Sequence, residues 1–175
     1  GLRWRPMAEV RLEHVHNCCV ETFWKLFFDV EYQTALFRDG LRFPSFEQLS
    51  LQETDTQIRR VIRVKPRVVG VPAPVQKLIG DGVSYEEHGV FDRTSRVFKY
   101  EIRTSRLPDK VKTSGVMYAL PAGEGKSKRV FEMSVVAKVF GVGGLIEKQI
   151  VQDTTRDYAT GAQFTNKYLA AKGLV

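Results

Sequence analysis

Alternating apolar and polar residues predict a series of β-strands along most of the chain. Residues 8–17 (AEVRLEHVHN) alternate Val10 and Leu12 with charged residues, which is the period of a half-buried strand. The same period recurs in six later segments, at residues 45–53, 57–66, 83–92, 96–105, 110–120 and 129–140. The first two of these are joined by a short polar turn and predict a hairpin. Each strand has one apolar face, so the sheet needs a cover on one side.

Two segments show helical spacing instead. In residues 18–37 aromatic residues such as Phe23 recur on one side of a helix, with Asn17 as the expected cap and Gly40 as the end. Residues 144–173 predict a second helix of about 25 to 30 residues. Its apolar side carries small and hydroxylic residues where a packed helix would carry leucine, so we expect space beside it.

Three glycines stand at the entry to this second helix, in the segment KVFGVGGLIEKQIV. A dinucleotide-binding loop needs a further glycine where this chain has Ile146, and the segment has no lysine–serine pair of a P-loop. We interpret Gly141, Gly143 and Gly144 as a sharp corner between a strand and a helix, where a side chain would clash. These glycines therefore do not indicate a nucleotide site.

Length, composition and charge narrow the class of protein. The 175 residues suit one domain at residues 7–175, with residues 1–6 an expression remnant or disordered. Adjacent Cys18 and Cys19 fit a reducing cytoplasm. The net charge of +7 permits anionic partners, but the basic run at residues 59–67 is interleaved with aliphatic residues, so nucleic acid is not the expected partner.

The order of the predicted elements resembles the helix-grip fold of the START-like (SRPBCC) superfamily. The segment VFGVGGLIEKQIVQDTTRDYATGAQFTNKYL is similar to the last strand, glycine turn and long helix of bacterial START-like proteins of unknown function. The resemblance covers nearly the whole chain. It implies an α+β fold in which a curved antiparallel sheet of about six to seven strands wraps around the C-terminal helix.

In that superfamily the space between sheet and helix usually holds a lipid, a sterol or a polycyclic compound. The residues expected on its wall alternate inward on the strands or lie on the apolar side of the last helix: Phe91, Phe98, Tyr100, Ile102, Met117, Met133, Val135, Val151, Thr154, Tyr158 and Ala162. The alternative is that these side chains pack together and leave no cavity.

Two charged residues are also expected among the inward positions. Strand alternation directs Arg60 and Glu87 toward the cavity, where an ion pair would hold the floor or meet a polar ligand head. A register shift of one residue would place both in water instead. The hydroxyls of Tyr100, Thr154 and Tyr158 could add hydrogen bonds.

An apolar loop with two prolines, at residues 68–82, is the expected lid of the cavity. Its side chains would move to admit a ligand and could touch an anionic membrane: Val71, Val75, Leu78 and Ile79. The alternative is a loop that folds these side chains onto the core.

Signals for catalysis or metal binding are weak. His14 and His16 could ligate zinc, but no third ligand is evident, so we predict neither a metal nor a cofactor. His88 is expected to point outward, and the nucleophile motif G-x-S-x-G does not occur. Glu87 is the candidate acid or base if the cavity supports a reaction.

The sequence therefore favours a cytoplasmic protein that binds, and transports or senses, a hydrophobic small molecule or lipid, with transient contact with anionic membranes. The alternative is an enzyme resembling polyketide cyclases/dehydratases, or a hydrolase, that uses the same cavity. The sequence does not predict the ligand or the oligomeric state.

Overall fold

A seven-stranded antiparallel sheet curves around one long helix in the computed structural model, which describes residues 8–174. The strands are β1 (Ala8–His16), β2 (Ser45–Glu53), β3 (Gln57–Lys65), β4 (Tyr85–Asp92), β5 (Phe98–Thr104), β6 (Val111–Pro121) and β7 (Ser127–Ala137). The helices are α1 (Val20–Phe28), α2 (Val30–Ala35), α3 (Ala73–Ile79) and α4 (Gly143–Ala171), with a π-helical turn η1 (Leu36–Gly40). The predicted helix-grip architecture is confirmed; the expectation for residues 1–6 lies outside the described residues.

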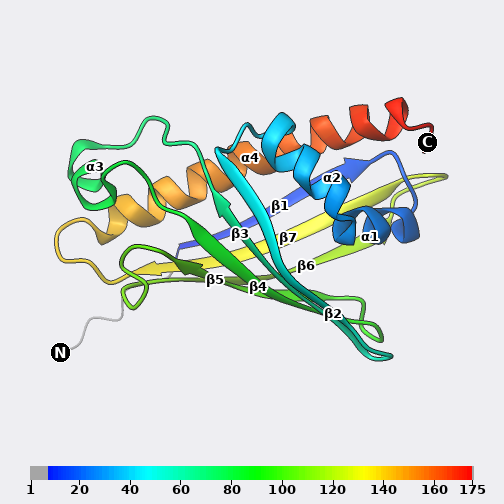
Figure 1. The fold of residues 1–175 in the computed structure, drawn as a ribbon, viewed down its shortest axis with the longest axis horizontal. Coiled ribbons are helices and arrows are strands. Elements are labelled where there is room, and N and C mark those ends of the chain that lie inside the picture. The colour runs from blue at the N-terminus through cyan, green and yellow to red at the C-terminus, as the bar shows by residue number, and fades with distance from the viewer. Residues whose placement is uncertain (1–7, 175) are drawn as a thin grey trace.

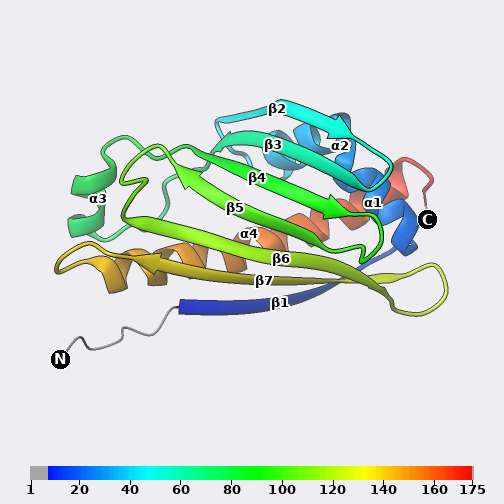
Figure 2. The ribbon, with the colours of Figure 1, turned by 90° about the horizontal axis from the view of Figure 1, so that it is seen from below.

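The strands follow the order β1-β7-β6-β5-β4-β3-β2, so the first strand lies beside the last (Figure 2). The predicted β2–β3 hairpin is confirmed, with Ser45 opposite Lys65 and an irregularity between Gln48 and Ser50. Figure 1 shows α4 lying along one face of the sheet, with α1 and α2 toward one end and α3 at the other. Among residues 8–174 no helix lies on the other face of the sheet (Figures 1 and 2).

Side chains alternate across the sheet as the sequence predicts. In β3, alternate residues from Ile58 to Val64, Arg60 among them, are buried. In β7 the buried alternate residues include Phe131 and Met133. This strand ends at Ala137, earlier than the predicted residue 140, because the chain turns there toward α4.

The N-terminal helical segment differs from the prediction of one continuous helix over residues 18–37. The chain bends at Asp29, whose side chain accepts hydrogen bonds from the backbone N–H groups of Glu31 (2.8 Å) and Tyr32 (3.2 Å) and so caps α2. Asn17 does not cap α1, because the helix begins at Val20 and its N-cap position falls on Cys19. Gly40 ends the segment as expected.

The glycine corner is confirmed as the entry to α4. Gly141 has a φ of +78°, a conformation that glycine adopts without a Cβ penalty, and the 29-residue helix begins two residues later. Gly173, with a φ of +67°, follows the end of the helix, as predicted. Between residues 8 and 174 no helix is both long and apolar enough to span a membrane.

Candidate functional site

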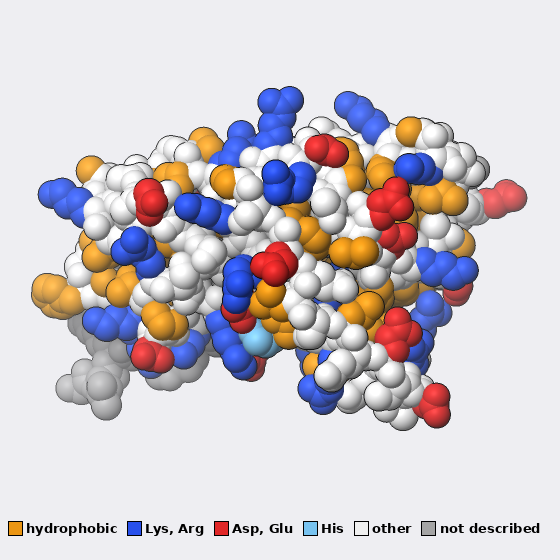
Figure 3. Space-filling view, in the orientation of Figure 1, with side chains coloured by type: hydrophobic (Ala, Val, Ile, Leu, Met, Phe, Trp, Pro, Cys, Tyr) orange, Lys and Arg blue, Asp and Glu red, His pale blue; other side chains and the backbone are white. Residues whose placement is uncertain are grey.

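A cavity of about 320 Å³ lies between the sheet and α4. Its lining extends from buried Met117 and Phe131 to exposed Val68 near α3, so the cavity opens at the surface. Figure 3, drawn in the orientation of Figure 1, shows hydrophobic side chains near the middle of the visible surface, with charged side chains around them. The volume lies at the lower end of the range for sites that hold drug-sized ligands.

The predicted ion pair between Arg60 and Glu87 is present in this cavity. Nη2 of Arg60 donates to Oε1 of Glu87 across 2.9 Å, and the two side chains are 2% and 15% exposed. Nη1 of Arg60 donates to the carbonyl of Phe27, and the guanidinium lies 4.2 Å from the centre of the Phe27 ring. A buried arginine needs such compensation, because an unpaired charge in the interior is costly.

Three tyrosines surround this pair. Burial raises the pKa of Tyr85, Tyr100 and Tyr158, and the Glu87 carboxylate adds to the rise in each. The hydroxyl of Tyr100 donates to the carbonyl of Glu132 at 3.0 Å. Tyr85 and Tyr158 keep accessible surface although they lie deep inside, because that surface meets the cavity. These phenols therefore stay protonated, and the O–H of Tyr100 is already used by the Glu132 carbonyl.

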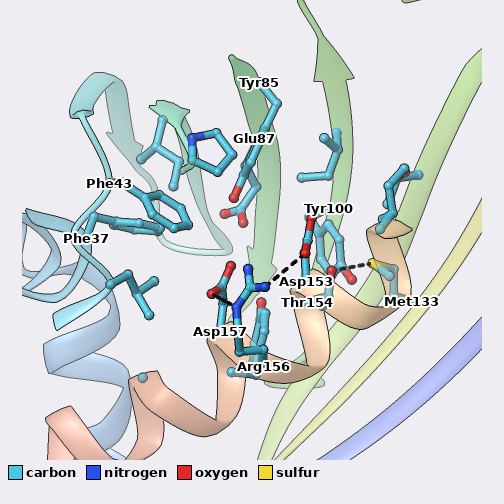
Figure 4. Close-up of a pocket in the computed structure, with 18 of the residues that line it drawn as sticks. Phe37, Phe43, Tyr85, Glu87, Tyr100, Met133, Asp153, Thr154, Arg156 and Asp157 are labelled. Atoms are coloured by element: carbon cyan, nitrogen blue, oxygen red, sulfur yellow. Dashed lines mark hydrogen bonds and ion pairs between the residues drawn. The ribbon is translucent and has the colours of Figure 1, made fainter. Parts of the chain in front are cut away.

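The α4 side of the cavity carries a second charged group, which the sequence analysis did not predict. Arg156 bonds to Asp153 (3.1 Å) and Asp157 (3.3 Å). Burial raises the pKa of both aspartates, although Arg156 opposes the rise. Figure 4 shows Tyr85 and Glu87 on the sheet opposite these three residues on α4. Their spacing of three and four residues along a helix was a signal that could have placed them on one face.

A second buried arginine lies on the other half of the sheet, in β7. Arg129 is 9% exposed, and Nη2 donates to Nδ1 of His14 (3.0 Å) and to the carbonyl of Tyr158 (3.2 Å). His16, next along the inner face of β1, is 1% exposed. Sequence reasoning missed Arg129, although extending the alternation back from Phe131 would have directed it inward.

The zinc hypothesis for His14 and His16 gains no support. Within residues 8–174 no group of three or more histidine, cysteine, aspartate or glutamate side chains lies close enough together to hold a metal ion. His14 instead accepts a hydrogen bond from Arg129, and His16 packs against the Phe23 ring at 5.3 Å. His88 bonds to Glu86 on the outer face, as predicted.

Most residues expected on the cavity wall lie there, and the rest lie in the packed core. Those that line the cavity are Arg60, Glu87, Tyr100, Ile102, Met117, Met133, Thr154 and Tyr158. Those that do not are Phe91, Phe98, Val135, Val151 and Ala162. Aromatic residues of α1 cover two of them, since Trp24 packs on Phe91 at 4.5 Å and Phe27 on Phe98 at 4.9 Å. Val135 and Val151 pack within the apolar cluster that also holds Ile146, and Ala162 is buried.

The expected lid residues also border the cavity: Val71, Val75, Leu78 and Ile79. Val75 is 4% exposed and packs with Val111 and Ile146, so this loop folds its apolar side chains onto the core. The large apolar side chains that the loop exposes are Val68 and Val69. Movement of the loop stays a prediction.

Stability should depend on pH through His16. Burial, helped by Arg129 and His14, lowers the pKa of His16 from 6.5 to about 3. Below pH 6.5 His16 binds a proton in the unfolded chain, whereas in the folded chain it stays neutral down to about pH 3. The contribution of neutral His16 to the free energy of unfolding is therefore fully present above pH 6.5. It falls by about 1.4 kcal/mol per pH unit as the pH is lowered from 6.5 toward 3.

Urea unfolding at pH 7 and pH 5 tests this dependence. When the pH is lowered from 7 to 5, we expect the free energy of unfolding of wild type to fall by about 2 kcal/mol more than that of His16→Gln. Equal losses in the two proteins would show that His16 does not stay neutral in the folded state.

Comparison with known proteins gives a family and a fold. A family model described as a protein of unknown function (DUF2505) matches residues 11–169. No curated protein sequence matches significantly. Because the identities with the solved structures below are 15% or less, the likeness to them establishes the fold alone.

Three solved structures illustrate that fold. The Zhui aromatase/cyclase of a Streptomyces species has a TM-score of 0.67 at 15% identity, over 96% of this chain and 99% of that chain. A START superfamily protein from Mycobacterium smegmatis has a TM-score of 0.59 at 13% identity, over 92% of this chain and 98% of that chain. A point mutant of norcoclaurine synthase from Thalictrum flavum, in complex with a transition-state analogue, has a TM-score of 0.64 at 15% identity. The match covers 96% of this chain and 97% of that chain. The fold is START-like.

Proposed function

The chain belongs to the DUF2505 family, and we propose that it binds a compact hydrophobic molecule between the sheet and α4 and carries or senses it. The cavity carries this proposal. Its wall is mainly aromatic and aliphatic, with polar and charged side chains at defined places, and small-molecule sites combine these two kinds of surface. Burial of apolar ligand surface, at roughly 25 cal/mol per Å², would drive binding against the cost of association.

The size of the cavity favours a small ligand within the classes expected from the sequence. A volume of about 320 Å³ suits a single chain or a few fused rings better than a lipid with two long chains. The Arg60–Glu87 pair and the protonated tyrosines would orient polar groups of that ligand.

An enzyme that uses the same cavity is the second candidate. The observation that favours it is the Glu87 carboxylate, which lines the cavity with tyrosine hydroxyls around it, opposite Asp157 with its raised pKa. The aromatase/cyclase and the norcoclaurine synthase are enzymes with a similar fold, which supports this second candidate. Binding is favoured because Arg60 already occupies Oε1 of Glu87.

Transient membrane contact fits the end of the molecule that holds α3 and the glycine corner. Phe140 is fully exposed there and lies between Lys138 and Lys148 in the sequence, both exposed. Figure 3 shows hydrophobic and basic side chains interspersed at this end. Exposed apolar residues beside lysines are suited to anionic lipid surfaces.

Filling the cavity should reduce ligand uptake. Thr154 lines the cavity, whereas its neighbour Thr155 is exposed. We expect Thr154→Trp to weaken binding of the neutral dye Nile red by about tenfold or more, and Thr155→Trp to leave it unchanged, by fluorescence titration. Equal binding by the two folded variants would argue against a ligand in this cavity.

The enzyme alternative can be tested with Glu87→Gln. Purified protein is incubated with an organic extract of its host cells, and conversion of any component is followed by mass spectrometry. If the cavity is catalytic, Glu87→Gln should lower turnover by about 100-fold or more and leave Nile red binding in place. Equal conversion by the variant would remove Glu87 from a catalytic role.

Membrane contact should depend on Phe140. In sedimentation with phosphatidylglycerol vesicles, we expect Phe140→Ser to reduce binding several-fold and added salt to weaken it further. Val30→Ser, an equally simple change at an exposed valine of α2, is the matched control. Loss of binding in the control alone, or in neither variant, would contradict this contact surface.

A further inference from the structure

Arg129 is a buried arginine whose charge no carboxylate offsets within residues 8–174. The other buried arginine of the cavity, Arg60, forms an ion pair with Glu87 at 2.9 Å. The exposed Arg156 forms ion pairs with two aspartates. No carboxylate lies within ion-pairing distance of Arg129 in the described part of the chain, although the residue is only 9% exposed. Such a charge is costly to bury, so its presence calls for an explanation.

The hydrogen bonds of Arg129 leave part of its guanidinium unused. Nη2 donates to Nδ1 of His14 and to the carbonyl of Tyr158, both uncharged acceptors. Nε is buried and has no hydrogen-bond partner among the described residues. A guanidinium carries five N–H donors in a planar fork, and this fork is completed only when an acceptor meets the remaining ones.

The surroundings of Arg129 form a polar region of the cavity that is separate from the Arg60–Glu87 pair. Arg129 and His16 both line it, and Nδ1 of His16, like Nε of Arg60 elsewhere in the cavity, is also buried without a partner among the described residues. The guanidinium lies 4.6 Å from the centre of the Tyr158 ring, which itself stacks on Phe131 at 4.0 Å. An aromatic wall therefore leads directly to an unpaired positive charge.

We propose that Arg129 binds the anionic head of the ligand, so that the cavity takes a compact amphiphile ending in a carboxylate or a phosphate. This rests on the proposed function of the cavity. The head would supply acceptors for the unused N–H groups of Arg129, and the apolar body would lie along Phe131 and Met133. The anion meets Arg129 rather than Arg60, since Glu87 already neutralises Arg60.

A purely structural role for Arg129 gives the opposite prediction for stability. If Arg129 serves only to hold His14 and Tyr158, then Arg129→Gln should destabilise the free protein. If Arg129 is kept for the ligand, Arg129→Gln removes an unpaired buried charge, and the free protein should be at least as stable. Urea unfolding of the ligand-free proteins separates the two roles.

Binding of matched amphiphiles tests the anionic head directly. Decanoate, decyl phosphate and the neutral decanol are titrated calorimetrically into delipidated wild type, Arg129→Gln and Arg129→Lys. The control is Arg59→Gln, which removes the same charge from an exposed residue of β3 outside the cavity lining. Wild type should bind one or both anions at least about tenfold tighter than decanol.

The variants should separate the head from the apolar body. Arg129→Gln should lose the preference for anions while its affinity for decanol stays within about twofold, and Arg59→Gln should keep the preference. Arg129→Lys keeps the positive charge but lacks the planar N–H donors of the guanidinium, so it should retain a reduced preference for anions over decanol. It replaces Arg129→Gln in this test if that variant does not fold. Tighter binding of decanoate or of decyl phosphate identifies the head as a carboxylate or a phosphate.

Three results would overturn the inference: no binding of either anion, equal affinity of wild type for anions and decanol, or an unchanged preference in both Arg129 variants. Decanol binding without any preference would overturn the anionic head alone and leave the hydrophobic cavity. Failure of all three amphiphiles together with Nile red would count against the cavity itself.

Discussion

The cavity depends on how α4 covers the sheet. The helix is fixed near both ends, where Ile146 is buried and Glu147 accepts a hydrogen bond from the N–H of Ala137, and where Leu169 is fully buried. Between these anchors the residues that line the cavity include Thr154 and Gly161, which are too small to fill the space. A curved sheet and a helix held at its ends therefore leave an opening along the middle of α4.

The charges on the sheet side of this opening form two polar regions. On one half of the sheet Arg60 and Glu87 neutralise each other, and tyrosine hydroxyls surround them. On the other half Arg129 is balanced only by neutral acceptors in the described structure. Because the wall between them is aromatic, a ligand with an apolar body and one polar end matches this distribution better than a uniformly apolar one.

Strand alternation predicted the inward residues well because it depends only on the local geometry of the chain. It placed Arg60 and Glu87 on the inner face, and the structure confirms their pair. It could not separate cavity wall from packed core, since that depends on α1: Trp24 and Phe27 cover Phe91 and Phe98. The break at Asp29, which lets α1 reach that part of the sheet, follows from a local cap that the apolar spacing concealed.

The long helix shows the same limit. Its length and both ends were predictable from its spacing and glycines, but its lining face is wider than its apolar stripe and includes Asp153 and Asp157. Charged residues on a helix are normally assigned to solvent. Only the shape of the sheet shows that these aspartates border a cavity.

Native mass spectrometry of the protein purified from cells tests the central claim most directly, with organic extraction to identify what is released. The account predicts a bound small molecule with an apolar body, present in wild type and depleted in Thr154→Trp. A wild-type protein that carries no molecule from any expression host, and takes up none when incubated with host lipid extract, would contradict it.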